Sequence, residues 1–382
     1  MENKICVYAI SKNEEQFVDR WADSMLEADA VVVLDTGSTD NTVEKLKAKG
    51  IIVKVEKIDP WRFDTARNHS LDMVPDDCNI LVCTDLDEVF EPGWAQPLRD
   101  NWIEGKHCRA TYRYAWSHLP NGEEGRVFRY DKIHSRNWHW TAPVHEMLVD
   151  NDNNSNKYLH ANTCDLFDTI HLHHYPDKTK SRSSYLPLLE KRKEEMPNDH
   201  YGLIYLAHEY YYRGYYDKAI EQLKEVLERF PNNLNSVETA SCYLFIGDSF
   251  LALADQISDE QDVVHAIDYY KLAIMKADSY REPYLNIAKA FMKQKNWISA
   301  EYYIKRGLEK SYRHYTWLER DTSWSYEPWD LLCLTAYYSG NYNSSAIYAS
   351  KALTYEPTNS RLLKNLQLCL NKLDSVIGLR LI

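Results

Sequence analysis

The chain has 382 residues, enough for two domains with separate hydrophobic cores. Its 45 Lys and Arg against 57 Asp and Glu give a formal net charge of −12, which argues against nucleic acid or an anionic membrane surface as the main partner. The eight cysteines form no C-x-x-C pair, which is typical of reduced, mostly buried thiols. No signal peptide opens the sequence, and no apolar run approaches the roughly 20 residues that span a bilayer. We therefore expect a cytoplasmic protein with no membrane span.

Short apolar runs of β character alternate with helical patterns in the first part of the chain. Residues 4–10, 30–35, 51–55 and 79–84 are predicted strands, and apolar residues at helical spacing follow the first two. This alternation predicts a parallel, doubly wound α/β sheet. No G-x-G-x-x-G follows the first strand and no P-loop motif occurs, so neither a Rossmann dinucleotide site nor a P-loop is supported.

Acidic residues stand at the carboxyl ends of several predicted strands. Asp85 and Asp87 end the fourth strand, and they would point to the same side if strand geometry persists there. Ser11, Glu14 and Asp35 follow or end the first two strands, at the edge where open α/β sheets bind ligands. Paired carboxylates at that edge would suit Mg²⁺ or Mn²⁺ with phosphates. For a D-x-D motif alone, a solvated acidic turn is the alternative.

Four sequence blocks together resemble a family 2 glycosyltransferase of the GT-A fold. They are I-S-K-N-E-E, V-V-V-L-D-T-G-S-T-D-N-T, F-D-T-A-R-N and L-V-C-T-D-L-D-E, in the family's order. The resemblance implies that the first two hold the uracil and ribose of a UDP-sugar, that A-R-N lies by the nucleotide, and that D-x-D binds Mn²⁺ or Mg²⁺. The implied nucleotide and metal residues are Ser11, Glu14, Asp35, Arg67, Asp85 and Asp87. A helix N-cap or a turn acid is the alternative for Asp35, and a surface ion pair is the alternative for Arg67.

The segment after the D-x-D is predicted to complete the same domain with strands over residues 110–116 and 125–130. The glycosyltransferases that this chain most resembles have a flexible turn before a V-H-E, which here includes His145 and Glu146. Imidazole beside a carboxylate suits metal binding and general base catalysis, so the resemblance implies His145 as a metal ligand and both residues as catalytic. Glu88 and Asp131 are alternative bases. Where the family often has Gly before the V-H-E, this chain has Ala142-Pro143.

A histidine-rich strand is predicted over residues 168–176. Related enzymes carry a similar histidine near the donor diphosphate, and the sequence does not decide between His173 and His174. His171 and His173 share one strand face at a zinc-like spacing, but no Cys or acid nearby in the sequence completes a set.

The sequence predicts three parts: a GT-A domain over residues 1–177, a linker helix over 178–197 and an all-α tetratricopeptide-like solenoid over 198–382. Four helix pairs fit the repeat pattern, with an insertion between the helices of the second pair, small residues such as Gly247 where helices cross closely, and a capping helix at the end. An aromatic loop over residues 312–329 carries rings for recognition or for packing.

The whole arrangement resembles bacterial and phage enzymes that include the S-glycosyltransferase of the sublancin type. It implies metal-dependent, inverting transfer of a sugar from a UDP-sugar to a peptide or protein, which the solenoid would bind unless it pairs two copies of the chain. A transferase acting on a polysaccharide or cell-wall glycan is the alternative enzyme. An inactive sugar-nucleotide-binding scaffold is disfavoured, because Asp85, Asp87, Arg67 and His145 are all present.

Overall fold

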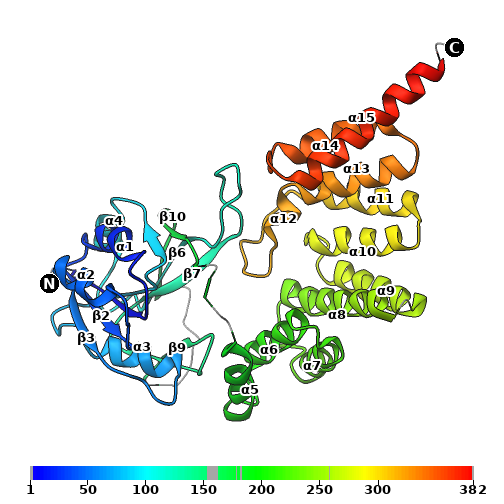
Figure 1. The fold of residues 1–382 in the computed structure, drawn as a ribbon. Coiled ribbons are helices and arrows are strands. Elements are labelled where there is room, and N and C mark those ends of the chain that lie inside the picture. The colour runs from blue at the N-terminus through cyan, green and yellow to red at the C-terminus, as the bar shows by residue number, and fades with distance from the viewer. Residues whose placement is uncertain (1–2, 153–161, 178, 181–182, 258, 381–382) are drawn as a thin grey trace. The chain divides into compact units, whose positions relative to one another are not determined.

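A computed structural model of the chain describes residues 3–152, 162–177, 179–180, 183–257 and 259–380. Its internal contacts divide the chain into two compact units (Figure 1). The α/β unit contains Met1–Ser117 and Val127–Pro197, and the helical unit contains His118–Arg126 and Asn198–Ile382.

The described part of the α/β unit is built around one large sheet, in the order β3-β2-β1-β4-β7-β6-β10-β5. The first four strands in this order are mutually parallel, as the sequence predicts. Strands β7 and β5 are antiparallel to their neighbours, whereas β10 is parallel to β6, so the sheet is mixed and mostly parallel. The strands are β1 (Ile5–Ser11), β2 (Ala30–Asp35), β3 (Ile52–Val55), β4 (Ile80–Thr84), β5 (Glu88–Phe90), β6 (Arg109–Ala115), β7 (Val127–His134) and β10 (Thr163–His174).

Both faces of this sheet are buried, because the alternating side chains of its central strand enter two different cores. Ile5 and Val7 of β1 pack in one core with Trp21 of α1. Cys6 and Tyr8 pack on the other face, where a two-stranded sheet contributes its apolar side chains. The elements that cover the sheet are α1 (Val18–Met25), α2 (Thr42–Ala48), α3 (Phe63–Leu71), α4 (Ala95–Asn101), β8 (Trp138–Thr141) and β9 (Met147–Asp150).

The strand register brings the ends of β1, β2 and β4 to one edge of the sheet. Ser11 pairs with Asp35, and Ala9 pairs with Thr84. The loops that leave these strands therefore meet where the chain switches direction across the sheet, between β1 and β4. In open α/β sheets such a point is where ligands bind.

The predicted linker region contains α5 (Tyr185–Glu195), which belongs to the α/β unit by its contacts. Residues 178, 181 and 182 of the predicted linker lie outside the described residues. All eight cysteines are free thiols, and Cys108 is the only one of them that is not buried.

The helical unit consists of four antiparallel helix pairs, a short helix in the aromatic loop and a final helix. In three pairs a residue with positive φ ends the first helix: Gly214, Lys295 and Gly340, at 78°, 57° and 79°. This left-handed residue lets the chain reverse within a few residues. The helices are α6 (His200–Tyr212), α7 (Tyr216–Arg229), α8 (Ser236–Ile257), α9 (Glu260–Lys276), α10 (Glu282–Lys293), α11 (Trp297–Leu308), α12 (Asp321–Trp324), α13 (Glu327–Tyr338), α14 (Tyr342–Leu353) and α15 (Ser360–Arg380).

Helix α8 absorbs most of the insertion expected in the second pair by extending to Ile257, while α9 starts at Glu260. Among the described residues it is the one helix long and apolar enough, by length and composition, to cross a membrane. The expectation that no apolar run approaches that length is therefore not met. Most of the apolar stretch is buried inside the structure, which is what a core helix between two neighbours requires.

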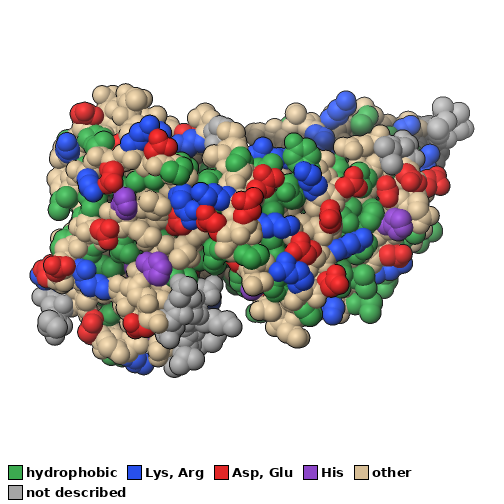
Figure 2. Space-filling view, turned by 90° about the horizontal axis from the view of Figure 1, so that it is seen from below, with side chains coloured by type: hydrophobic (Ala, Val, Ile, Leu, Met, Phe, Trp, Pro, Cys, Tyr) green, Lys and Arg blue, Asp and Glu red, His purple; other side chains and the backbone are tan. Residues whose placement is uncertain are grey.

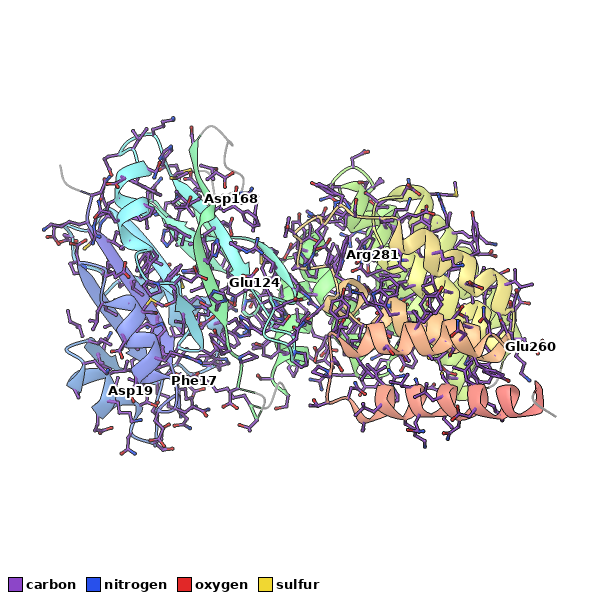
Figure 3. The ribbon with its side chains drawn as sticks, turned by 90° about the horizontal axis from the view of Figure 1, so that it is seen from above. Phe17, Asp19, Glu124, Asp168, Glu260 and Arg281 are labelled. Atoms are coloured by element: carbon purple, nitrogen blue, oxygen red, sulfur yellow. The ribbon has the colours of Figure 1, made fainter. Side chains whose placement is uncertain are left out.

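The rings of the aromatic loop pack within the helical unit. Trp317 lies 4.9 Å from Tyr205, between ring centroids. The guanidinium of Arg281, labelled in Figure 3, lies 3.6 Å from the centre of the Trp324 ring. Trp329 packs against the core formed by α10, α11 and α13. These contacts favour packing over recognition for the loop's tryptophans.

The surface charge of the chain is mixed. On the face drawn in Figure 2, basic and acidic side chains are interspersed among hydrophobic ones over the described residues. The net charge of −12 is therefore not gathered into one patch on this face.

We predict that Gly247→Ala destabilises the helical unit. A Cβ at Gly247 would lie 2.6 Å from the ring of Tyr270, which cannot retreat freely because its hydroxyl donates to Asp248 at 2.8 Å. Overpacking costs about 1–3 kcal/mol, and the better helix propensity of Ala returns about 1 kcal/mol, so we expect a net loss of about 1 kcal/mol. Denaturant unfolding followed by circular dichroism measures it. Gly307→Ala, whose Cβ would meet Tyr284 at 3.1 Å, should cost less; an equal or larger loss there would contradict the argument.

Candidate functional site

The turn after β2 is organised by a buried carboxylate. Asp35 is 0% exposed, and its oxygens accept hydrogen bonds from the backbone N–H groups of Gly37 and Ser38, at 3.0 and 2.8 Å. They also accept from the hydroxyls of Ser11 and Ser38, at 2.8 and 2.5 Å. Asp35 and Ser11, both predicted nucleotide residues, thus hold the loops after β1 and β2 together. The geometry matches the turn-acid alternative for Asp35, whose lone pairs are used within the protein.

Glu14, also a predicted nucleotide residue, lies in the loop after β1 and is mostly buried. Its Oε1 pairs with Lys180, and its Oε2 is buried with no hydrogen-bond partner in the described part of the chain. Burial raises the pKa of Glu14, Lys180 opposes this rise, and the charges of Asp87 and Asp85 add to it; the resulting pKa is about 7. Three acids therefore gather at the carboxyl ends of β1 and β4.

The D-x-D does not continue the strand before it. Strand β4 ends at Thr84, and a turn follows in which the N–H of Glu88 donates to the carbonyl of Asp85 at 3.0 Å. The condition for two aspartates on one strand face is therefore not met. Asp85 bonds to Arg67, whereas Asp87 lies beside His174, with 3.3 Å between Oδ2 and Nε2. The two carboxylates serve different partners.

Arg67 is a buried cation that bridges two of the predicted site residues. It is 3% exposed, and its Nη2 donates to Asp85 at 2.8 and 3.1 Å. Its Nε forms an ion pair with Glu146. The surface ion pair considered for Arg67 is therefore ruled out for this buried side chain. Because both carboxylates occupy the guanidinium, Arg67 acts in this geometry by placing Asp85 and Glu146.

The charges around Arg67 fix the ionisation of its neighbours. Burial alone would raise the pKa of Asp85, but Arg67 and Lys132 lower it below its usual range. The same balance lowers the pKa of Glu146, where the raising effect of burial is overcome by the same two cations. A carboxylate with a lowered pKa that is already paired is a weak base. This geometry suits Glu146 as an anchor for Arg67 better than as the proton acceptor.

Lys132 is a site residue that the sequence did not indicate. It is 8% exposed, and its Nζ lies 3.4 Å from Asp85. Burial would lower the pKa of Lys132, but the charge of Asp85 dominates and the pKa stays well above its usual value. The predicted strand ended at residue 130, whereas β7 continues to His134 and so brings Lys132 into the site.

Glu88, an alternative base, is also buried at this edge. Its Oε1 accepts from the Tyr114 hydroxyl at 2.7 Å, and its Oε2 accepts from the N–H of Asp85 at 2.9 Å. Burial raises the pKa of Glu88, and the charges of Asp85 and Asp87 add to that rise against Lys132. Glu88 thus stabilises the D-x-D turn by linking the N–H of Asp85 to the hydroxyl of Tyr114. Asp131, the other alternative base, pairs with Arg109 at 2.7 Å.

His173 and His174, between which the sequence does not decide, lie beside different acids in the structure. His174 is 7% exposed and lies beside Asp87, and although burial lowers its pKa, the bond to Asp87 raises it overall. His173 instead faces Glu91, at 3.0 Å between Nε2 and Oε1. His171 also faces Glu91, at 3.5 Å. Glu91 thus supplies the acid that was missing beside these two histidines in the sequence.

The V-H-E follows a tight turn in which two residues have positive φ. Ala142 has a φ of 78° and His145 a φ of 50°. Ala142 therefore adopts the left-handed backbone that glycine would accept without strain. The His145 ring lies against Tyr185, 5.7 Å between centroids.

The residues present fit a divalent cation only in part. The described residues contain no group of three His, Cys, Asp or Glu side chains that could hold a metal, so the predicted set of Asp85, Asp87 and His145 is not assembled. Asp85 is engaged by cations, and His145 lies against Tyr185. Asp87 and His174 remain as a carboxylate and an imidazole side by side. A cation at a phosphate site is commonly held by one or two protein ligands, with phosphates and water completing the sphere. Asp87 supplies the carboxylate oxygen that Mg²⁺ or Mn²⁺ prefers, whereas His174 can act as a ligand only when its Nε2, which faces Asp87, carries no proton.

We predict that Arg67→Met destabilises the α/β unit by about 3 kcal/mol, because removing one partner of a buried ion pair leaves the other charges uncompensated. Arg67→Lys keeps the charge without the planar fork, so its free energy of unfolding should lie between those of Arg67→Met and the unsubstituted protein. Urea unfolding followed by tryptophan fluorescence provides the measurement. The exposed Arg20→Met on α1 serves as a matched control, and an Arg67→Met protein as stable as this control would contradict the bridging role.

We predict that the stability of the α/β unit carries a pH dependence from Glu14. Because its folded pKa of about 7 exceeds the unfolded value of about 4.3, the folded state holds an extra proton between these values. The stability that protonated Glu14 contributes is fully present below the unfolded pKa, and it is lost as the pH rises through 7. The unfolding free energy of Glu14→Gln, relative to the unsubstituted protein, should therefore increase from pH 5 to pH 8. A constant difference would contradict the prediction, and Lys180→Met should move the effect to higher pH.

Family models match the N-terminal α/β part of the chain and the first of its helix pairs. Residues 6–149 match the Glycosyl transferase family 2 model, and residues 200–233 match the Tetratricopeptide repeat model. No curated protein matches the sequence. A thermophilic TPR protein of Thermus thermophilus is 20% identical with a TM-score of 0.39, over 48% of this chain and 88% of that one. A tetratricopeptide repeat protein from Parabacteroides merdae is 13% identical with a TM-score of 0.38, over 50% and 66%. The chain thus carries a family 2 glycosyltransferase domain followed by tetratricopeptide repeats.

Proposed function

We propose that the α/β unit transfers a sugar from a UDP-sugar, with inversion at the anomeric carbon, to a side chain of a peptide or protein. The observation that carries the proposal is the pairing of Asp87 with His174 beside the end of β4, 3.3 Å apart. It stands at the sheet edge where the loops of Ser11, Glu14 and Asp35 also meet. A nucleotide-sugar donor follows from the family 2 domain.

Asp87 and His174 would hold Mn²⁺ or Mg²⁺, which supplies positive charge to the departing diphosphate. Lys132 and Arg67 add two fixed cations to this edge, both buried and both placed on Asp85. Because Asp85 and Glu146 already neutralise these two cations, the charge of a departing diphosphate would be met by the divalent cation. Ser11 and Asp35 keep the loops after β1 and β2 in place around the nucleotide.

The acceptor's proton is assigned to the V-H-E turn. Glu146 is held by Arg67, so we place His145 as the group that takes the proton and Glu146 as the carboxylate that anchors the turn. An imidazole is a common general base near neutral pH. His145 is half-buried, so its ring combines fixed placement with access to an acceptor.

The helical repeats support a peptide or protein acceptor, since tetratricopeptide repeats present surfaces for extended or helical protein segments. An S-glycosyltransferase of the sublancin type is the specific form of this proposal. The sugar acceptor would then be a cysteine side chain, and a polysaccharide acceptor is the outcome to be tested against it.

The decisive test measures UDP binding by calorimetry and UDP release from UDP-glucose, UDP-galactose and UDP-N-acetylglucosamine, with Mn²⁺ or with a chelator. The unsubstituted protein should bind UDP more tightly with Mn²⁺ and release UDP from at least one donor. Asp87→Asn and His174→Asn should each weaken the Mn²⁺-dependent binding by about tenfold or more, because each removes one of two protein ligands.

Glu91→Gln is the matched control, since Glu91 faces His171 and His173 and not Asp87. Metal dependence that survives in Asp87→Asn would contradict the metal assignment. Binding of UDP without its release from any donor would favour the scaffold, and failure to bind UDP would contradict the donor assignment. With an active donor, transfer to cysteine, serine or asparagine peptides, compared with transfer to glycans, decides the acceptor class.

A further inference from the structure

The helix α5 (Tyr185–Glu195) follows the last strand of the sheet and precedes the repeats. It lies outside residues 6–149, which match the family 2 model, yet it belongs to the α/β unit by its contacts. Arg62 pairs with Glu195 of this helix at 2.8 Å, and the ring of Phe63 lies 6.0 Å from that of Tyr185. Both ends of α5 are thus fixed to the segment that begins α3.

Arg192 of α5 enters the interior and reaches the V-H-E turn. It is 0% exposed, and its Nη1 donates to the carbonyl of Val144 at 2.8 Å and to the carbonyl of His145 at 2.5 Å. A buried cation needs acceptors, and two consecutive carbonyls supply them here. The planar guanidinium suits this task, because its donors are fixed in direction, whereas an ammonium is a flexible point charge.

The turn that Arg192 holds does not rest on local preference alone. Ala142 and His145 both have positive φ, which L-residues adopt only when the surrounding contacts hold them there. From α3, the N–H of Phe63 donates to the carbonyl of Pro143 at 3.0 Å. Asn68 exchanges two hydrogen bonds of 2.8 Å with the backbone of Trp140. Helix α3 therefore fixes the approach to the turn, and Arg192 fixes its exit at His145.

The held turn is connected to the D-x-D. Glu146 follows His145 directly and forms the ion pair with Arg67, which in turn bonds to Asp85. A shift of the His145 backbone would therefore change the direction of the imidazole and the placement of Arg67 together. These contacts form a continuous path from α5 to the carboxyl end of β4.

We propose that Arg192 is a positioning residue for the glycosyl transfer: by binding the carbonyls of Val144 and His145, it makes α5 part of the catalytic unit and sets the orientation of His145. The catalytic part of this inference rests on the proposed function. The positioning part rests on the contacts themselves, and the two are tested by separate measurements.

The experiment compares Arg192→Met, Arg192→Lys and the control Lys191→Met in the full chain. Lys191 is the adjacent cation on α5, and its side chain is 40% exposed beside Glu195. Hydrogen exchange of the peptide that spans residues 142–147, UDP affinity with Mn²⁺, and the kinetics of UDP release from the active UDP-sugar are measured for each variant.

We expect Arg192→Met to speed exchange in residues 144–147 while the sheet strands exchange as before. It should lower kcat for UDP release by about tenfold or more with little change in KM, because misplacement of a reacting group acts mainly in the transition state. Arg192→Lys keeps the charge and N–H donors but lacks the fixed planar fork, so it should restore part of the loss. Lys191→Met should change neither quantity.

Two results would overturn the inference. Unchanged exchange in residues 144–147 in Arg192→Met would show that the turn holds without Arg192. Faster exchange to the same extent throughout the α/β unit, with kcat and KM both altered, would show a general structural role. If the unsubstituted protein releases no UDP, the proposed function fails, and the exchange measurement still decides whether Arg192 holds the turn.

Discussion

The site depends on one buried guanidinium. Arg67 lies between Asp85, after β4, and Glu146, in the V-H-E turn, so it ties together two segments that are far apart in sequence. Such a bridge adds little net stability, because desolvating three charges offsets most of their attraction. The full set of pairs forms only when α3, β4 and the turn have all reached their places.

The same electrostatics gives the two aspartates of the D-x-D different tasks. Asp85 is held ionised by Arg67 and Lys132, which keep its pKa low, and it shapes the site from beneath. Asp87 is left to His174 and retains the exposure that a metal ligand needs. Glu14 pairs with Lys180 and has a pKa of about 7, so near neutral pH it is partly protonated, whereas Asp85 stays ionised.

The helical unit is stabilised differently, because its helix pairs repeat and each pair contacts mainly its neighbours. One exception is Asp248 on α8, which accepts from Tyr270 and Asn286 and pairs with Arg320 at 2.6 Å. This buried carboxylate fastens the aromatic loop to two repeats. The loop's tryptophans are then part of the core.

The sequence determined the features that depend on local periodicity. Strand and helix alternation predicted the α/β sheet and placed Ser11, Glu14, Asp35, Asp85 and Asp87 at one sheet edge, and the repeat offsets predicted the four helix pairs. Which charges meet was decided only by the tertiary structure. Asp85 faces Arg67 because the strand ends at Thr84, His174 and not His173 lies beside Asp87, and Lys132 arrives on a strand longer than predicted. Burial can be predicted because it follows a repeating pattern along the chain. An ion pair forms between side chains from distant segments, so a local sequence pattern does not predict it.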